Sequence, residues 1–201
     1  MILRVVSGRV PAGQLPAVRA AFTRDYLPAT RRFRGLDRYL VATRPAGDGH
    51  EIAMMTVWHE LDDALAAFDG DLEQVRTIDG LDHGEILDRV DHYEVDLSEV
   101  KQSSGTPRFL RLTAGVVGHG LDSDIQGALR TRLADLPEVV VDAYVGRRVM
   151  GATVEIAFVS TWTEQPAGFS LDAPIWPDIS AHYETFTLGL YDVLLEGAGP
   201  A

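Results

Sequence analysis

The sequence predicts an α+β protein built from two tandem ferredoxin-like repeats, each with the element order βαββαβ. Three observations support this prediction: an internal sequence repeat, the same order of strands and helices in both halves, and a polar linker between the halves. The first repeat spans residues 1–99, and the second spans residues 107–197. Residues 98–107, which end in Ser-Ser-Gly-Thr-Pro, form the predicted linker.

The internal repeat is clearest in one ten-residue motif. Residues 51–60 read E-I-A-x-x-T-x-W-x-E, and residues 155–164, which begin 104 positions later, read E-I-A-x-x-S-x-W-x-E. Shorter matches keep the same order on both sides of this motif, including one that aligns Arg4 with Arg111. The number of residues that separates matching segments changes slightly and in order along the chain. Loop insertions and deletions in a duplicated chain produce such changes. The alternative is a chance similarity between two strands that end in tryptophan.

The first repeat begins with an alternating, Val- and Leu-rich strand that Pro11-Ala12-Gly13 interrupts. Apolar residues then recur at helical spacing from Leu15 to Tyr26, and Pro16 is tolerated in the first turn of that helix. A second helical region begins at Leu61 and becomes less regular beyond Gly70. The predicted strands are residues 2–10, 36–44, 51–58 and 88–97.

The second repeat follows the same order. Its first helix carries leucine or isoleucine at helical spacing between residues 121 and 136. A proline-interrupted segment with a short helix takes the place of its second helix. The predicted strands are residues 109–117, 139–149, 153–162 and 187–195.

Both faces of the predicted sheets are apolar. In the strand 51–58, Ile52, Met54 and Trp58 point to one side, while Met55 and Val57 point to the other. Helices can cover only one face of such a sheet. We therefore expect the two repeats to pack sheet against sheet within one chain.

Composition excludes several classes of protein. The chain has 201 residues and a formal net charge of −12, a field that repels the phosphate backbone of nucleic acids. The absence of cysteine excludes disulfides, cysteine-ligated metals and thiol nucleophiles. No apolar run approaches the ~18 residues that a membrane span needs, and the N-terminal sequence lacks the features of a signal peptide. We expect a cytoplasmic protein that binds neither nucleic acid nor membranes.

One pattern is specific for a known family. A strand, the sequence Gly-Arg-Val-Pro-Ala-Gly, a helix, and a strand that ends in Val57-Trp58-His59-Glu60 before another helix resemble the antibiotic-biosynthesis-monooxygenase-type domain. The resemblance covers nearly the whole chain, once per repeat, and is better in the first repeat. That domain belongs to the dimeric α+β barrel superfamily. The resemblance implies that the two repeats form an intramolecular pseudo-dimer, and it leaves a further homodimer open.

The superfamily hosts monooxygenases, haem-degrading enzymes, haem proteins, isomerases and proteins without known activity, so the resemblance indicates fold more strongly than activity. In the similar enzymes, aromatic residues line a pocket between sheet and helices. We therefore assign substrate binding to four residues: Trp58, Trp162, Tyr144 and His92. The two tryptophans occupy matching strand ends, where each could instead only anchor a helix against its strand.

We assign catalysis to two arginines and two histidines: Arg4, Arg111, His83 and His182. In the strand 109–117, the even-numbered residues from Leu110 to Val116 are apolar, so we expect them to face the helices. Arg111, which alternates with them, should then face away from the helices, and the same alternation places Arg4 likewise. A buried arginine needs a partner, because an unpaired buried charge costs several kcal/mol. Asp142 or an acidic ligand could supply it. The alternative is that both arginines sit at a rim and reach water.

His83 and His182 precede two tyrosines that match across the repeat. Haem-degrading relatives place an axial histidine on their second helix in this region, so haem with His182 or His83 as ligand is an alternative. The sequence contains no asparagine. The haem-degrading relatives and one group of cofactor-free monooxygenases use a pocket asparagine, so neither mechanism carries over directly.

The leading hypothesis is a cofactor-independent monooxygenase-like enzyme that binds a small, flat aromatic or polyketide-type molecule. Its arginine would stabilise a developing phenolate, its tryptophan would stack on the substrate, and a histidine would take a proton. No cofactor and no metal are expected under this hypothesis. Two alternatives stay open: a haem-binding or haem-degrading protein of the same superfamily, and a non-catalytic small-molecule-binding or structural barrel.

Overall fold

The structure is a computed structural model that describes residues 1–75, 87–101, 105–118, 120, 122–165, 179 and 181–199. The chain divides into two compact units. Unit 1 contains residues 1–92 and 192–201, and unit 2 contains residues 93–191. The unit boundaries therefore fall inside two long strands, β4 (Leu87–Val100) and β8 (Tyr183–Gly197).

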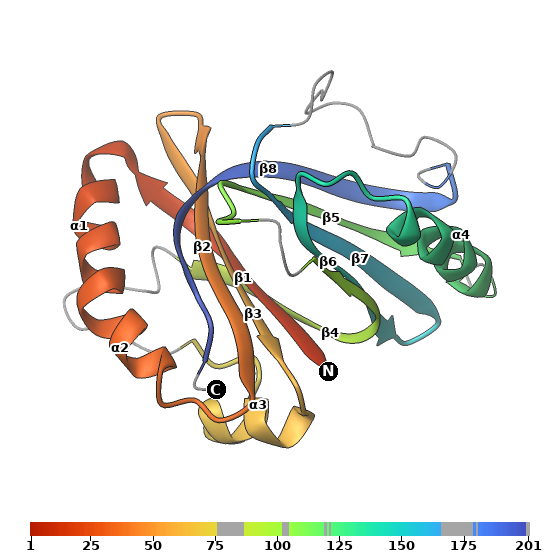
Figure 1. The fold of residues 1–201 in the computed structure, drawn as a ribbon, viewed down its shortest axis with the longest axis horizontal. Helices are drawn as coiled ribbons and strands as arrows, with labels where there is room; N and C mark the ends of the chain where they lie inside the picture. The colour runs from red at the N-terminus through yellow and green to blue at the C-terminus, as the bar shows by residue number, and fades with distance from the viewer. Residues whose placement is uncertain are drawn as a thin grey trace. The chain divides into compact units, whose positions relative to one another are not determined.

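Unit 1 contains an antiparallel sheet with β3 at its centre (Figure 1). β3 pairs on one side with β1 and on the other with β2, which also pairs with residues 192–197 of β8. β4 is the other neighbour of β1. The predicted strands of this half are confirmed, with the bounds β1 (Ile2–Pro11), β2 (Leu36–Ala46) and β3 (Gly49–Trp58).

Helical segments pack on one face of the unit 1 sheet (Figure 1). The predicted helix from Leu15 begins with a proline in its first turn, as expected, but it is not uniformly α-helical. Its middle is a π-helical segment in which the Leu27 amide donates to the Phe22 carbonyl. The bounds are η1 (Ala12–Gln14), α1 (Leu15–Ala21), η2 (Phe22–Tyr26), α2 (Leu27–Thr30) and α3 (Leu61–Ala67).

Pro28 explains the π-helical turn. A proline has no N–H to donate to the carbonyl four residues earlier, and its ring collides with that carbonyl. The helix meets this constraint by widening over Phe22–Tyr26 before it continues as α2. Phe22 and Tyr26 are both buried on the sheet side of this segment.

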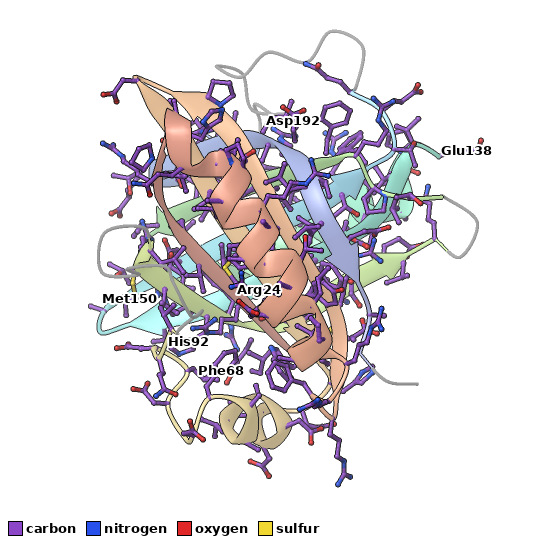
Figure 2. The ribbon with its side chains drawn as sticks, turned by 90° about the vertical axis from the view of Figure 1, so that its left-hand side faces the viewer. Arg24, Phe68, His92, Glu138, Met150 and Asp192 are labelled. Atoms are coloured by element: carbon purple, nitrogen blue, oxygen red, sulfur yellow. The ribbon has the colours of Figure 1, made fainter. Side chains whose placement is uncertain are left out.

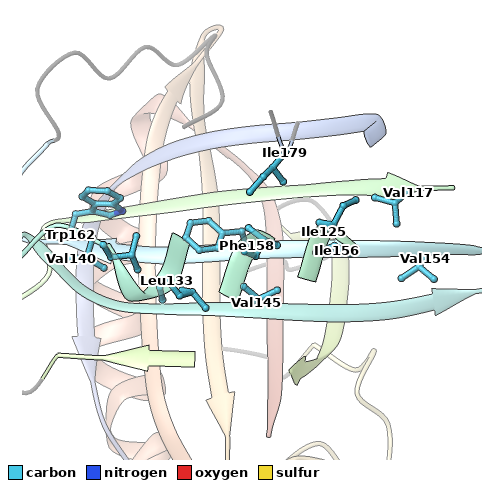
Figure 3. Close-up of a cluster of buried hydrophobic side chains, with 13 residues drawn as sticks. Val117, Ile125, Leu133, Val140, Val145, Val154, Ile156, Phe158, Trp162 and Ile179 are labelled. Carbon is cyan, nitrogen blue, oxygen red and sulfur yellow. The ribbon is translucent and has the colours of Figure 1, made fainter. Parts of the chain in front are cut away.

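Unit 2 contains a second antiparallel sheet with β7 at its centre. β7 pairs with β5 and with β6; β6 also pairs with residues 94–100 of β4, and β8 is the other neighbour of β5. The helix α4 packs on one face of this sheet through apolar side chains that meet Phe158 and Trp162 of β7 (Figure 3). The bounds are β5 (Phe109–Val117), α4 (Asp122–Ala134), β6 (Val140–Met150) and β7 (Thr153–Trp162).

The chain is thus an α+β protein with antiparallel sheets, as the sequence predicts. The short helix predicted between β7 and β8 lies mostly outside the described residues, as does the later part of the helical region that starts at Leu61. No helix in the described parts of the chain has the length and apolar character needed to cross a membrane.

Candidate functional site

The most distinctive polar group in unit 1 is Arg4, which lies in the layer between the sheet and the helical segments. Ile2, Val6 and Val10, which share its side of β1, pack against those segments. The predicted orientation of Arg4 is therefore wrong: its side chain faces the helices. The alternation of apolar residues did not identify the helix side of β1, because both sides of this strand are buried. Leu3 and Val5, on the side opposite Arg4, are buried as well.

The guanidinium of Arg4 is held by the segment that follows α3. Its Nε donates to the carbonyl of Leu72 at 2.7 Å, and its Nη2 donates to the carbonyl of Gln74 at 2.6 Å. Its Cζ lies 4.1 Å from the centroid of the Phe68 ring, which caps the C-terminal end of α3. These contacts fix the plane of the guanidinium, and only 3% of Arg4 is exposed.

Arg4 carries a buried positive charge that no carboxylate balances directly. No carboxylate of the described residues forms an ion pair with it, and its remaining N–H donors make no hydrogen bond within the described parts of the chain. Desolvation lowers the pKa of Arg4 to about 10, while Tyr26 and Asp71 act in the opposite direction. The side chain therefore stays protonated at neutral pH and would favour an anionic ligand.

The Phe68 ring beside this cation packs against Trp58, which in turn packs against Phe33. Trp58 is fully buried, and its ring centroid lies 5.8 Å from that of Phe33 and 5.7 Å from that of Phe68. Its Nε1 donates to Thr56 Oγ1 at 3.0 Å, and Thr56 lies directly opposite Arg4 on the neighbouring strand. Trp58 thus supplies both packing and one wall of the layer that contains Arg4.

Unit 2 repeats part of this arrangement. Arg111 of β5 lies opposite Ser160 of β7, and the Nε1 of Trp162 donates to Ser160 Oγ at 2.8 Å. Phe109 and Val117, which share the parity of Arg111, pack with α4, so Arg111 also faces the helix side, contrary to the prediction. Burial lowers the pKa of Arg111 to about 9.

The strand registers of the two units are equivalent in further detail. In both units a β-bulge directly follows the residue that pairs with the tryptophan. Leu36 of β2 pairs with Trp58, and the bulge lies between Leu36 and Arg38. Val140 of β6 pairs with Trp162, and the bulge lies between Val140 and Asp142. The same registers place an arginine opposite a glutamate, and both arginines bind their partner: Arg44 with Glu51 and Arg148 with Glu155.

Two residues predicted near the site of the second half lie on the opposite face of its sheet. Asp142 lies opposite Thr161, whose Oγ1 donates to it at 2.7 Å, whereas Arg111 lies opposite Ser160. Because successive side chains of a strand alternate between faces, Asp142 and Arg111 point to opposite faces of the sheet. Tyr144 is buried, and its neighbour Ala143 packs towards α4. Because neighbouring side chains of a strand alternate, Tyr144 points away from that helix, to the face opposite Trp162.

The histidines are dispersed. His92 is half-buried on β4 in unit 1, and its Nδ1 has no hydrogen-bond partner among the described residues (Figure 2). His182 is exposed in a turn before β8, where its amide donates to the Ile179 carbonyl, so it does not project from a helix as the haem alternative requires. His83 lies outside the described residues. The part of the chain that the structure describes contains no group of three or more histidine, aspartate or glutamate side chains arranged to hold a metal ion.

Sequence reasoning missed Tyr26, Phe68 and the hydroxyl partners of the tryptophans. The signal for the hydroxyls was present, because Thr56 and Ser160 occupy the same place in the repeated motif, two residues before each tryptophan. No local signal identified Phe68, since its contact with Arg4 joins residues far apart in the sequence.

No family model matches the chain, and no curated protein is significantly similar to it in sequence. Solved structures do match over 98% of the chain. A proposed monooxygenase from Fusobacterium nucleatum subsp. nucleatum superposes with a TM-score of 0.69 at 14% identity, over 94% of its own chain. A proposed monooxygenase from Lactobacillus acidophilus gives 0.65 at 8% identity, over 95% of its chain, and an anthrone oxidase-like protein gives 0.59 at 15% identity, over 93%.

These likenesses concern the fold. The chain has the fold of monooxygenase-like proteins, and the sequence-based resemblance to the antibiotic-biosynthesis-monooxygenase-type domain is confirmed at that level.

Proposed function

We propose that the protein is a cofactor-independent oxidoreductase of the monooxygenase type that acts on a small aromatic substrate. The site is the layer between the sheet and the helices of unit 1, around Arg4, Trp58 and Phe68. The observation that carries this proposal is that Arg4 is a buried cation without a carboxylate partner among the described residues. It lies over the Phe68 ring, which packs against Trp58. Such a group suits a flat substrate that becomes an anion during the reaction.

The chemistry needs only the substrate and O₂. A ring CH₂ flanked by aromatic carbonyl or phenol groups loses a proton, and the charge that remains spreads onto a ring oxygen. The carbanion reduces O₂ as a new C–O bond forms, and the resulting peroxide loses water. The CH₂ group becomes a carbonyl, so one substrate and one O₂ give one ketone and one H₂O.

Each residue has a defined part in this scheme. Arg4 stabilises the anionic ring oxygen with N–H donors that are not used by Leu72 and Gln74. Trp58 and Phe68 provide apolar surface that excludes water. His92, on the strand next to β1, accepts the proton through its unbonded Nδ1.

We also propose that the two units arose by tandem duplication. The support comes from the register, because the arginine, the hydroxyl residue, the tryptophan, the bulge and the arginine–glutamate pair recur at equivalent positions of both sheets. Under this proposal, Arg111 and Trp162 are the counterparts of Arg4 and Trp58. The first unit is the better candidate for activity, because the family pattern is more complete there.

Oxygen consumption tests the function. The purified protein is incubated with anthrone- and quinol-type compounds, and O₂ uptake is followed together with the appearance of the ketone. We expect uptake above the non-enzymatic rate, and a loss of about 100-fold in Arg4→Met, since one electrostatic donor contributes roughly 10²–10³ in rate. His92→Gln should lower the rate at neutral pH while substrate binding is retained.

The matched control is Arg9→Met, which removes an exposed arginine from the same strand. It should leave the rate unchanged. Absence of O₂ uptake by the wild-type protein with every compound would overturn the proposal, as would an Arg4→Met variant that is folded and as active as the Arg9→Met control.

A further inference from the structure

A concave surface in unit 1 lies outside the layer that contains Arg4. This groove has a volume of about 590 Å³ and is lined by six residues of the first helical segment and one of β8. The lining residues are Leu15, Pro16, Arg19, Ala20, Thr23, Arg24 and Leu194. We propose that this groove binds an organic anion with an elongated apolar body, such as a medium-chain carboxylate.

One wall of the groove is shaped by the π-helical turn. Arg19 lies on α1, whereas Thr23 and Arg24 lie within η2. Widening this turn changes the direction in which the side chains of residues 23 and 24 leave the helix. π-Helical turns are rare and recur at functional sites, and this one places two polar side chains at the same end of an apolar groove.

The one β8 residue that lines the groove, Leu194, lies at a β-bulge. Val41 of β2 pairs with Leu195, and Ala42 pairs with Val193, so Leu194 is the extra residue on β8. In a regular strand, Leu194 and Leu195 would point to opposite faces. The bulge allows Leu195 to pack with the helix-side core while Leu194 lines the groove. Two departures from regular backbone geometry, far apart in sequence, therefore border one surface.

The chemistry of the lining suits an amphipathic anion. Leu15, Pro16, Ala20 and Leu194 give an apolar floor, and the arginines stand at the same surface of a protein whose net charge is −12. Arg24 is held by a bidentate contact with Asp25, whose carboxylate largely neutralises it. Arg19 makes no side-chain hydrogen bond or ion pair within the described parts of the chain, so it is the cation available to a carboxylate.

The groove and the Arg4 layer lie on different sides of the same helical segment. Val18, Ala21, Phe22 and Tyr26 face the sheet and are buried, whereas the residues that line the groove are exposed or half-buried. Binding in the groove therefore does not require the chemistry proposed for Arg4.

Calorimetric titration of the whole protein with decanoate tests the proposal, with decanol and decyltrimethylammonium as matched probes. We expect saturable binding of decanoate, binding at least tenfold weaker for decanol, and none for the cation. Arg19→Gln should weaken decanoate binding about tenfold, because it removes a charge-assisted hydrogen bond. Leu194→Asp should abolish binding, because it places a like charge against the ligand in the floor.

Arg31→Gln is the control, because Arg31 is an exposed arginine of the same helical region that does not line the groove. It should bind decanoate as the wild type does, and so should Arg4→Met. Circular dichroism and thermal unfolding establish that each variant is folded. If decanoate fails to bind, binds equally to the Arg19→Gln and Arg31→Gln variants, or binds no better than decanol, the proposal is overturned.

Discussion

The guanidinium carbon of Arg4 lies 4.1 Å from the centroid of the Phe68 ring, and both side chains are buried. This contact joins the first strand to the end of α3, and the carbonyls of Leu72 and Gln74 complete the surroundings of the cation. A cation over an aromatic face contributes more when water is excluded, up to about 2 kcal/mol. The pair is therefore expected to couple the sheet to the segment after α3.

A double-mutant cycle measures that coupling. Arg4→Met, Phe68→Leu and the double variant are compared with the wild type by urea denaturation. We expect a coupling free energy of about 1–2 kcal/mol, because Phe68→Leu removes the aromatic face but keeps an apolar side chain. A parallel cycle of Arg4→Met with Phe22→Leu, whose ring packs with Tyr26 instead, serves as the control. Equal coupling in the two cycles would contradict a specific Arg4–Phe68 interaction.

The sequence was sufficient to predict where the strands lie along the chain, because these positions depend on patterns within each half. The repeated motif aligned Thr56 with Ser160 and Trp58 with Trp162, and the hydrogen bonds of the two units follow that alignment. The faces of the strands were not predictable in the same way. When both faces of a strand are buried, hydrophobic alternation carries little information about which face meets the helices.

The hydrogen-bond partners of Arg4 could not be predicted from local sequence patterns. Its partners Leu72 and Gln74 use backbone carbonyls, which every residue possesses, so no side-chain motif marks them. The π-helical turn could have been predicted, since Pro28 stands where a helix through Leu27 would need an N–H. The bulge at Leu194 could not, because it depends on how β8 pairs with a strand more than 140 residues earlier.

The hydrogen bond from Trp58 to Thr56 gives a second prediction. Trp58 is fully buried, so Thr56→Val would leave its Nε1–H without an acceptor while it preserves the shape of the side chain. We expect the free energy of unfolding to fall by about 1–3 kcal/mol. Ser160→Ala should lower it similarly in unit 2, since the Nε1 of Trp162 donates to Ser160. Urea denaturation measures both changes.

Two further variants separate the hydrogen bond from other effects of these changes. Thr56→Ser keeps an acceptor for the indole and should recover most of the loss. Thr43→Val alters another buried threonine, on β2, whose side chain makes no hydrogen bond with the described residues. It should be nearly neutral. A Thr56→Ser variant as unstable as Thr56→Val would show that the methyl group, and not the hydroxyl, is responsible for the effect.

Tyr183 gives a prediction for alkaline pH. Burial raises the pKa of this tyrosine from 10.0 to about 12, because its ring packs against the α4-side core of unit 2 and over Gly115, where a Cβ would collide with it. The folded protein therefore binds more protons than the unfolded chain between these two values. The stabilising contribution of the protonated phenol is complete below pH 10 and is lost as the pH rises through about 12.

We expect the free energy of unfolding of the wild type to fall over this interval by roughly 2 kcal/mol more than that of Tyr183→Phe, which has no phenol to ionise. Urea denaturation at a series of pH values gives the two curves, and tyrosinate absorbance in the near ultraviolet reports the titration directly. In the native wild type, one tyrosine should ionise about two pH units late, and that late step should be absent from Tyr183→Phe. Parallel stability curves for the two proteins would mean that Tyr183 titrates alike in the folded and unfolded chains, and that its burial does not disfavour the phenolate.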